Sequence, residues 1–265
     1  MLIDNFDIIR SHLTFEPAMK FDAETKKLKR LNDTYDRYIV QILRRAKDVD
    51  GKEYGVNTSN RLIKTYEISS LEYFDKKRAH IMDLCRTNKA RAYILPQVRA
   101  TYDCLKEMLK LVVDNLENPT IKFQHVLRSA LCSMHKSRDK RWILDLDDDN
   151  MMEYILDDDT VTCKEWTPEK AMELVRGLLS EIGRNPDDAY MLRTPHGKTI
   201  VTPPFNLQEA NKRCNLIYQG SHKPIIDVTT HDGKKMYVYG ELKNGWLIKD
   251  GMALLYFCDD DLTEI

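Results

Sequence analysis

The sequence predicts a mixed α/β (α+β) protein built from two modules. Stretches rich in β-branched and aromatic residues alternate with stretches of helical periodicity, and turn residues separate them. Charged residues make up 31% and hydrophobic residues 42% of the 265 residues, a balance typical of a folded globular chain. Such a chain buries a core as one large domain or as two modules that share it, and we place the modules at residues 1–135 and 136–265.

The first module is expected to combine strands with two helices. In chain order we expect a surface helix or loose arm over 20–37, strands over 38–43, 62–68 and 90–95, and helices over 71–86 and 98–116. The start of the first helix is marked by Ser69-Ser70-Leu71-Glu72, a capping box in which the Ser69 hydroxyl and the Glu72 carboxylate accept from backbone N–H groups.

The long second helix is predicted from one apolar stripe. Its apolar residues recur at alternating steps of four and three, and they are Val98, Tyr102, Leu105, Leu109, Val112 and Leu116. Because stripes of this kind are usually buried, we expect this one to pack in the core.

The second module has the clearest order of elements. We expect a strand over 141–147, an acidic irregular stretch to Glu165, a helix from Pro168 to Gly183, strands over 190–194 and 198–202, a short helix over 206–214 and a strand over 224–228. This β-α-β-β-α-β order is that of a ferredoxin-like or RRM-like half-barrel. Strands over 236–239, 246–248 and 252–257 are expected to form an appended β-meander.

Composition also narrows the location and the partners. The longest apolar runs fall far short of the ~20 residues that a membrane helix needs, and acids stand near Met1 where a signal peptide carries Lys or Arg. The six cysteines are spread singly without a C-x-x-C pair, which favours reduced thiols. We therefore expect an intracellular, cytoplasmic protein with no membrane partner. The net charge of −1 means that any basic surface must be local.

Two aspartates at the end of one predicted strand suggest a metal site. Side chains alternate across a strand, so Asp145 and Asp147 share a face, where their mutual repulsion is relieved by a divalent cation. Mg²⁺ or Mn²⁺ suits such oxygen ligands. If the strand over 224–228 belongs to the same sheet, Asp227 completes a three-carboxylate cluster; Asp250 is the competing third carboxylate, and a solvated acidic strand end is the alternative to metal binding.

A glycine turn supplies candidate contacts to a nucleoside triphosphate. Thr194, His196 and Lys198 place a hydroxyl, an imidazole and an ammonium around Gly197, groups that hold phosphates by charge-assisted hydrogen bonds. The spacing is not that of a P-loop, and an ordinary hairpin is the competing interpretation.

Basic residues near strand ends are candidates for nucleic-acid binding. Arg44 and Arg45 follow one predicted strand, and Arg91 and Arg99 flank another. Together they can form a discontinuous groove for backbone phosphates, although each cluster alone is more often a solvated face.

In order, these motifs resemble those of archaeo-eukaryotic primase and primase-polymerase catalytic domains. That family has an Asp-x-Asp pair, then a small residue and a histidine leading into a strand, then an Asp at the end of a hydrophobic strand. The resemblance covers residues 140 to 230 and implies that Asp145, Asp147 and Asp227 bind metal and that the turn from Thr194 to Lys198 contacts the triphosphate. The family's histidine falls near Thr199, whereas this chain has His196 in the turn. The chain is also similar to phage-encoded proteins.

Three functions follow as hypotheses. The first is a metal-dependent nucleotidyltransferase of the primase-polymerase type that acts on a DNA or RNA template, with the four arginines on the template backbone. The second is a non-catalytic phage protein of the same fold that binds nucleic acid. The third is a viral factor in the host cytoplasm that binds a host protein through its acidic stretches.

Overall fold

The computed structural model shows a mixed α+β protein with antiparallel sheets. It describes all residues except 16, 23, 26, 35, 46–60, 118–125, 127–128, 131–138, 148–150, 158–159, 214–215, 219–223, 230–234, 240, 243–247, 250 and 260–265. The chain divides into two compact units. Unit 1 consists of Met1–Arg141 and Asp250–Ile265, and unit 2 is Trp142–Lys249. None of the helices in the described ranges is long and apolar enough to cross a membrane.

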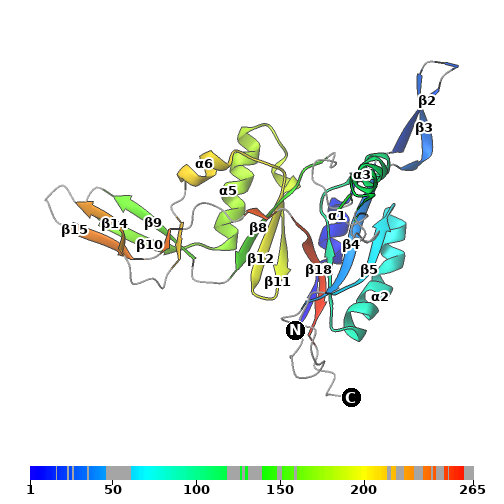
Figure 1. The fold of residues 1–265 in the computed structure, drawn as a ribbon. Coiled ribbons are helices and arrows are strands. Elements are labelled where there is room, and N and C mark those ends of the chain that lie inside the picture. The colour runs from blue at the N-terminus through cyan, green and yellow to red at the C-terminus, as the bar shows by residue number, and fades with distance from the viewer. Residues whose placement is uncertain are drawn as a thin grey trace. The chain divides into compact units, whose positions relative to one another are not determined.

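Unit 1 is built on an antiparallel sheet with the strand order β1-β18-β6-β4-β5 (Figure 1). The strands are β1 (Leu2–Asp4), β4 (Asp36–Arg44), β5 (Arg61–Ile68), β6 (Arg91–Ile94) and β18 (Ala253–Cys258), and β7 (Arg99–Ala100) pairs with the start of β4. The strands predicted over 38–43, 62–68 and 90–95 are thus confirmed. The last strand was predicted as part of a meander in the second module, and that prediction is wrong, because β18 is hydrogen-bonded between β1 and β6.

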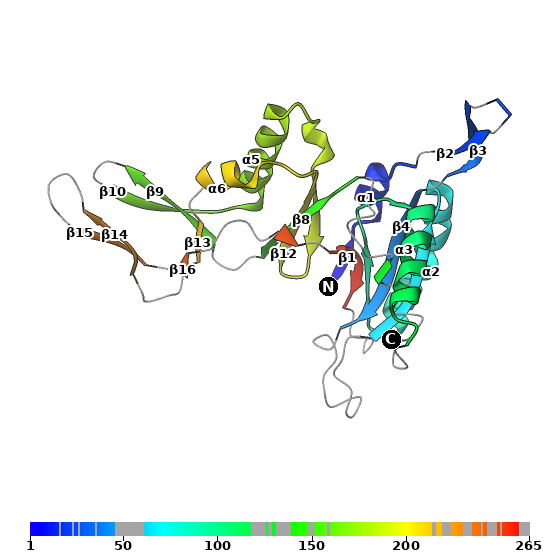
Figure 2. The ribbon, with the colours of Figure 1, turned by 45° about the horizontal axis from the view of Figure 1, so that its top comes forward.

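Two helices cover the sheet of unit 1. Helix α2 (Leu71–Thr87) confirms the helix predicted over 71–86, and it packs against β4, β5, β6 and β18 (Figure 2). Its N-cap is Ser70, not Ser69 as predicted, because the Tyr73 N–H donates to Ser70 Oγ at 3.1 Å. Helix α1 (Phe6–His12) buries Phe6 against Phe74 of α2, with ring centroids 5.2 Å apart.

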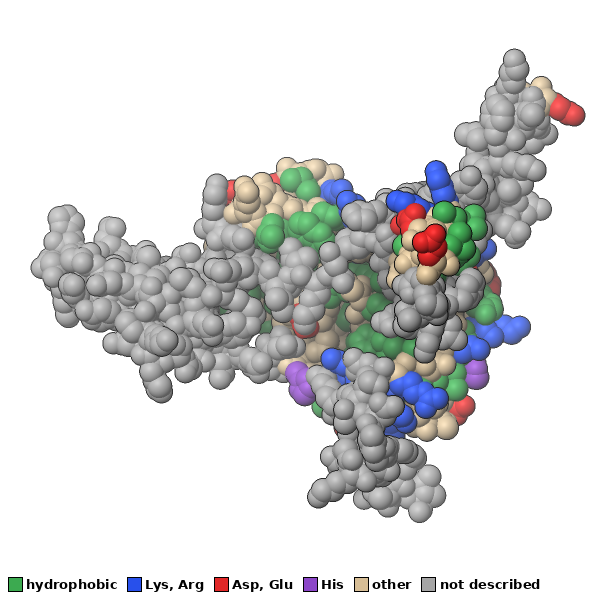
Figure 3. All heavy atoms as spheres, viewed as in Figure 1, with side chains coloured by type: hydrophobic (Ala, Val, Ile, Leu, Met, Phe, Trp, Pro, Cys, Tyr) green, Lys and Arg blue, Asp and Glu red, His purple; other side chains and the backbone are tan. Residues whose placement is uncertain are grey.

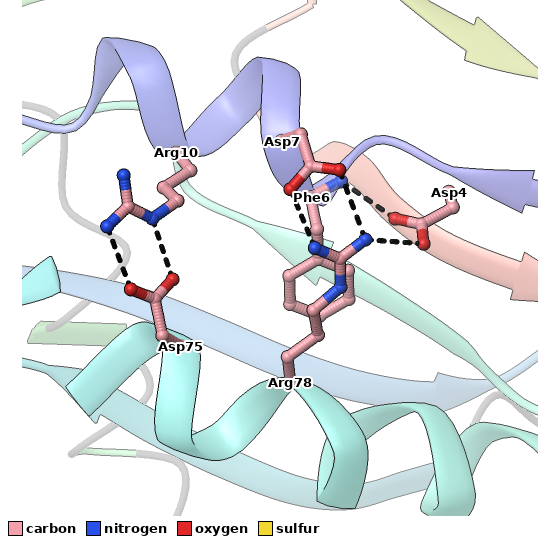
Figure 4. Close-up of polar contacts among 6 residues, drawn as sticks. All are labelled: Asp4, Phe6, Asp7, Arg10, Asp75 and Arg78. Atoms are coloured by element: carbon pink, nitrogen blue, oxygen red, sulfur yellow. Dashed lines mark hydrogen bonds and ion pairs between the residues drawn. The ribbon is translucent and has the colours of Figure 1, made fainter. Parts of the chain in front are cut away.

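Ion pairs tie α1 and the end of β1 to α2 (Figure 4). The Arg78 guanidinium donates to Asp7 Oδ1 at 2.6 Å and to Asp4 Oδ2 at 2.9 Å. Its carbon lies 5.1 Å from the centroid of the Phe6 ring. One turn along α1, Arg10 donates to both oxygens of Asp75, at 2.7 and 2.8 Å. Charge pairing and aromatic packing therefore hold the same two helices together.

The pair of Arg10 and Asp75 predicts a pH-dependent loss of stability. Hydrogen bonding from Arg10 lowers the pKa of the Asp75 carboxyl, so the pair stabilises the fold above the ordinary carboxyl pKa of about 3.9 and stops doing so as pH falls through the lowered value. We expect Arg10→Gln to unfold at lower urea concentration than the wild type at pH 7, by a small margin because both side chains are half exposed. The margin should shrink below pH 4, and a margin that grows there would contradict this assignment.

The predicted arm over residues 20–37 is a β-hairpin. Strand β2 (Pro17–Asp22) pairs with β3 (Lys27–Thr34), and Phe21 lies opposite Leu28. The prediction of a helix or loose arm is therefore wrong. Met19 and Phe21 alternate with Lys20, a period of two that indicates a strand and that the high Lys and Arg content hides.

The predicted long helix is α3 (Thr101–Asp114), but much of its stripe is not buried. Val98 is buried before the helix begins, whereas 63% of Leu109 and 72% of Leu116 are exposed. Figure 3 shows hydrophobic side chains at the surface over α3. The prediction of a buried stripe is wrong for these residues, because periodicity shows which face of a helix is apolar but not whether anything covers it.

Unit 2 contains a second antiparallel sheet, with the order β11-β12-β8-β17. Its elements are β8 (Trp142–Asp147), β11 (Tyr190–Thr194), β12 (Gly197–Thr202), β17 (Ile248–Lys249), the helices α5 (Pro168–Glu181) and α6 (Leu207–Arg213), and the 3₁₀ helix η3 (Pro186–Asp188). Helix α5 starts as predicted, since the Lys170 N–H donates to Thr167 Oγ1. It ends at Glu181, and Gly183 follows its C-cap with φ +70°, the left-handed conformation that stops a helix. Leu179 of α5 packs in a core with Leu144 and Ile200 of the sheet.

Between β8 and α5 the chain forms a hairpin instead of the irregular stretch that was predicted. Strands β9 (Met151–Asp157) and β10 (Thr160–Glu165) pair in register and belong to a sheet of order β10-β9-β13-β16. The other two strands of that sheet are β13 (Leu216–Tyr218) and β16 (Glu241–Leu242). The sequence signal for β9 is its run of apolar and β-favouring residues, Tyr154, Ile155 and Leu156, which the surrounding acids obscure.

The strand predicted over 224–228 does not join β8. It is β14 (Pro224–Thr229), which pairs with β15 (Lys235–Tyr239) in a separate two-stranded sheet. The strand that pairs with β8 on this edge is β17, with Ile248 opposite Leu144. The strands predicted over 236–239 and 252–257, and the end of the one predicted over 246–248, are present, but the prediction of a meander is wrong because they pair in three separate sheets. The two units divide the chain after Arg141 and again after Lys249, where it returns to unit 1.

Candidate functional site

The two faces of β8 differ in chemistry. Leu144 and Leu146 are buried in the core under α5. Asp145 alternates with them along β8 and lies on the other face, as the sequence predicts. The Asp145 side chain is partly buried. Asp147 is the last residue of β8, two positions beyond Asp145, where the strand pairs with the start of β12.

Asp145 has a hydrogen-bond donor on the neighbouring strand. Thr199 of β12 lies directly opposite Asp145, and its Oγ1 donates to Asp145 Oδ1 at 3.2 Å. Only 4% of Thr199 is exposed, so water does not compete for this hydroxyl. Thr199 is not among the predicted site residues, because it lies 54 positions from Asp145 in the chain and only the register of β8 and β12 brings the two together.

Two positions further along β8, three residues lie in one row across the sheet: Asp147 of β8 is opposite Gly197 of β12, and Gly197 is opposite Thr194 of β11. Gly197 has φ +156°, which glycine adopts more readily than other residues, and it places no side chain between its two neighbours in the row. Thr194 Oγ1 is buried and has no hydrogen-bond partner among the described residues. Because buried hydroxyls are normally hydrogen-bonded, Thr194 is the member of the predicted triphosphate turn whose hydroxyl still lacks an acceptor among the described residues.

The other two predicted contacts of this turn do not lie with Thr194. Lys198 forms an ion pair with Glu169 at the start of α5, on the helix-covered side of the sheet. A step of one residue along β12 reverses the face, so Lys198 and Thr199 point to opposite sides. His196 is exposed at the tip of the turn. The three predicted nucleotide contacts therefore do not converge: Thr194 and Lys198 lie on opposite faces of the sheet, and His196 lies in the turn.

The expected third carboxylate is not in the sheet of Asp145. Asp227 belongs to β14 and lies opposite Tyr237 of β15, so the prediction of a common sheet is wrong. Its competitor, Asp250, lies outside the described residues. Within the described part of the chain, no group of three or more Asp, Glu, His or Cys side chains is arranged to hold a metal ion.

The four predicted nucleic-acid contacts fall into two pairs. The buried Arg91 stacks 4.3 Å from the centroid of the Phe257 ring, and Arg99 is fully buried. Arg44 and Arg45, at the end of β4, are partly exposed, and Arg45 Nη1 donates to the hydroxyl of Tyr93 at 3.4 Å. A template backbone can reach Arg44 and Arg45 but not the buried pair as they stand.

Two cysteines of unit 1, Cys85 and Cys258, are buried. Cys85 and Cys258 form no disulfide, and burial raises the pKa of the Cys85 thiol to about 12. A thiol with this pKa is protonated at neutral pH and is therefore a poor nucleophile.

Comparison of the chain with protein-family models, curated proteins and solved structures finds no match. The fold and the site define the class to which this chain belongs: a mixed α+β protein in which one face of an antiparallel sheet carries Asp145, hydrogen-bonded to Thr199, beside the buried apolar residues Ile143, Leu192 and Val201.

Proposed function

We propose that this protein is a divalent-metal-dependent nucleotidyltransferase of the primase-polymerase type, acting on a nucleic-acid template. One observation carries the proposal: the Asp145 carboxylate on β8 accepts a hydrogen bond from the buried Thr199, and two positions further along β8 the backbone of Asp147 lies in register with Gly197 and Thr194. Carboxylates and hydroxyls in this arrangement are suited to Mg²⁺ or Mn²⁺ and to a nucleoside triphosphate.

The order of the strands supports the proposal. If β8, β11, β12 and β17 are numbered one to four along the chain, their order in the sheet is two, three, one, four, with all neighbours antiparallel. Helix α5 lies between the first two strands and α6 between the last two. This order of strands and helices supports the proposal of a ferredoxin-like or RRM-like palm, in which β9–β10 and β13–β16 would be insertions.

Two protein carboxylates are sufficient for such a site. Mg²⁺ is usually bound through one or two carboxylates, and the rest of its shell comes from water and substrate phosphates. A bound ion would neutralise charge on the triphosphate and activate the attacking hydroxyl. Asp145 and Asp147 would hold the ion, and the Thr194 hydroxyl would donate to a phosphate oxygen. Asp227 is not required.

The proposal predicts that Asp145→Asn loses metal-dependent nucleotide binding. An amide removes the charge that binds the ion but keeps the shape of the side chain, so the fold should survive. We expect the affinity for Mn²⁺, and then for nucleoside triphosphate, to fall by about 100-fold or more in calorimetric titrations, in line with the loss of a direct charged ligand. Primer extension should disappear with it.

Asp187→Asn is the matched control, since Asp187 is an exposed carboxylate of unit 2 in η3. It should bind Mn²⁺ as the wild type does. If Asp145→Asn binds metal and nucleotide with wild-type affinity, the proposed metal site is wrong.

The partly exposed Arg44 and Arg45 favour a second candidate, a nucleic-acid-binding protein without catalysis. In that case Arg44→Glu together with Arg45→Glu should abolish binding to single-stranded DNA and RNA, and Asp145→Asn should leave binding unchanged. Each lost phosphate contact should also reduce, by about one, the slope of the logarithm of the binding constant against the logarithm of the salt concentration. Fluorescence anisotropy at several salt concentrations separates the two candidates.

A further inference from the structure

We infer that Thr199 is a positioning residue of the proposed metal site, which orients the carboxylate of Asp145 for a divalent cation. The inference rests on the proposed function, and it adds to it a residue that supports a metal ligand from the adjacent strand.

The hydrogen bond between the two residues has a fixed direction. An ionised carboxylate is only an acceptor, so the Thr199 hydroxyl must donate to Asp145 Oδ1 across the 3.2 Å that separates the two oxygens. Since Thr199 is almost fully buried, this hydroxyl is screened from water. Hydrogen bonds to charged acceptors are stronger than those between neutral groups, so the contact restrains rotation of the carboxylate.

The backbone at Thr199 is held on both sides. Strand β12 lies between β11 and β8, with Leu192 and Asp145 opposite Thr199 on the two neighbouring strands. Threonine is also branched at Cβ, which restricts the torsion that aims its hydroxyl. The donor therefore has a well-defined position relative to the carboxylate.

No other side chain of β12 can replace this donor. On the face of Asp145 the strand presents Gly197, Thr199 and Val201, and only Thr199 carries a side-chain hydrogen-bond donor. Residues that orient a metal ligand in this way typically change metal affinity by about 10- to 100-fold when they are removed. Thr199 is expected to act through Asp145 without touching the ion.

The test measures Mn²⁺ affinity by electron paramagnetic resonance in full-length protein. Thr199→Val removes the hydroxyl but keeps the branched shape, and Thr199→Ser restores the hydroxyl. Thr202→Val is the matched control: Thr202 is a fully buried threonine of the same strand, but its hydroxyl donates to the backbone oxygen of Pro203 at 3.0 Å.

We expect Thr199→Val to weaken Mn²⁺ binding by about 10-fold or more, with Thr199→Ser and Thr202→Val within about threefold of the wild type. If Thr199→Val does not fold, Thr199→Ala serves as the variant without a hydroxyl. Wild-type affinity in the variant without a hydroxyl would overturn the role of Thr199 and leave the metal site standing. An equal loss of Mn²⁺ affinity in Thr202→Val would also overturn the role of Thr199, because the effect would then follow from the loss of any buried hydroxyl of this strand. A wild-type protein that binds no Mn²⁺ would reject the proposed function itself.

Discussion

Removal of residues 252–265 is expected to unfold unit 1, although all remaining strands of that sheet are still present in the shortened chain. Strand β18 is hydrogen-bonded to β1 on one side and to β6 on the other, and all six of its residues are buried. Burying a large apolar side chain contributes about 1.5–3 kcal/mol, so Leu254, Leu255 and Phe257 together contribute about 5–9 kcal/mol. That loss is comparable with the whole stability of a typical domain, about 5–15 kcal/mol.

The expected result is a chain in which unit 1 gives no dispersed amide signals in a ¹H–¹⁵N spectrum and is rapidly cut by protease. Removal of residues 260–265 alone is the control, since it leaves β18 and Asp259 in place and should preserve the spectrum. A chain ending at Gly251 that keeps the dispersed signals of unit 1 would show that β18 is not an integral strand of this sheet.

Phe6→Ala should destabilise unit 1 by about 3–5 kcal/mol, the range for removing a buried aromatic side chain. Only 1% of Phe6 is exposed, and its ring lies between Phe74 of α2 and Tyr256 of β18, at centroid distances of 5.2 and 6.4 Å. The Arg78 guanidinium packs on the same ring (Figure 4). Alanine would leave a cavity at the point where α1, α2 and the sheet meet.

Urea denaturation followed by circular dichroism measures this loss. Ile8→Ala is the control on the same helix, because 40% of Ile8 is exposed and its truncation should cost less than about 1 kcal/mol. Phe6→Leu, which keeps much of the volume, should fall between the two. Equal losses in Phe6→Ala and Ile8→Ala would mean that Phe6 does not link these elements.

Helix α5 shows how much local sequence signals can establish. Thr167 as N-cap, Pro168 in the first turn and Gly183 at the end mark its limits, and the structure confirms them. Each of these signals acts within one or two turns of the chain, so the contacts that decide the helix are already present in the sequence.

Strand β18 shows what local sequence signals do not determine, namely the partners of a strand. Its composition marks it as a strand, but the choice of partners depends on residues at the other end of the chain: Tyr256 lies opposite Asp4. Strand pairing is decided by which apolar faces can be buried together, and a sequence pattern does not contain that information. The same limit explains why β17, and not β14, lies beside β8.

For the candidate site, the sequence by itself determined that Asp145 and Asp147 share one face of a strand, because the alternation of side chains follows from the backbone alone. Only the tertiary structure decided that Thr199 supports Asp145, that Lys198 turns away to Glu169, and that Asp227 belongs to another sheet. These outcomes depend on strand register, where a shift of one residue exchanges the two faces, and register is set by the packing of the whole sheet.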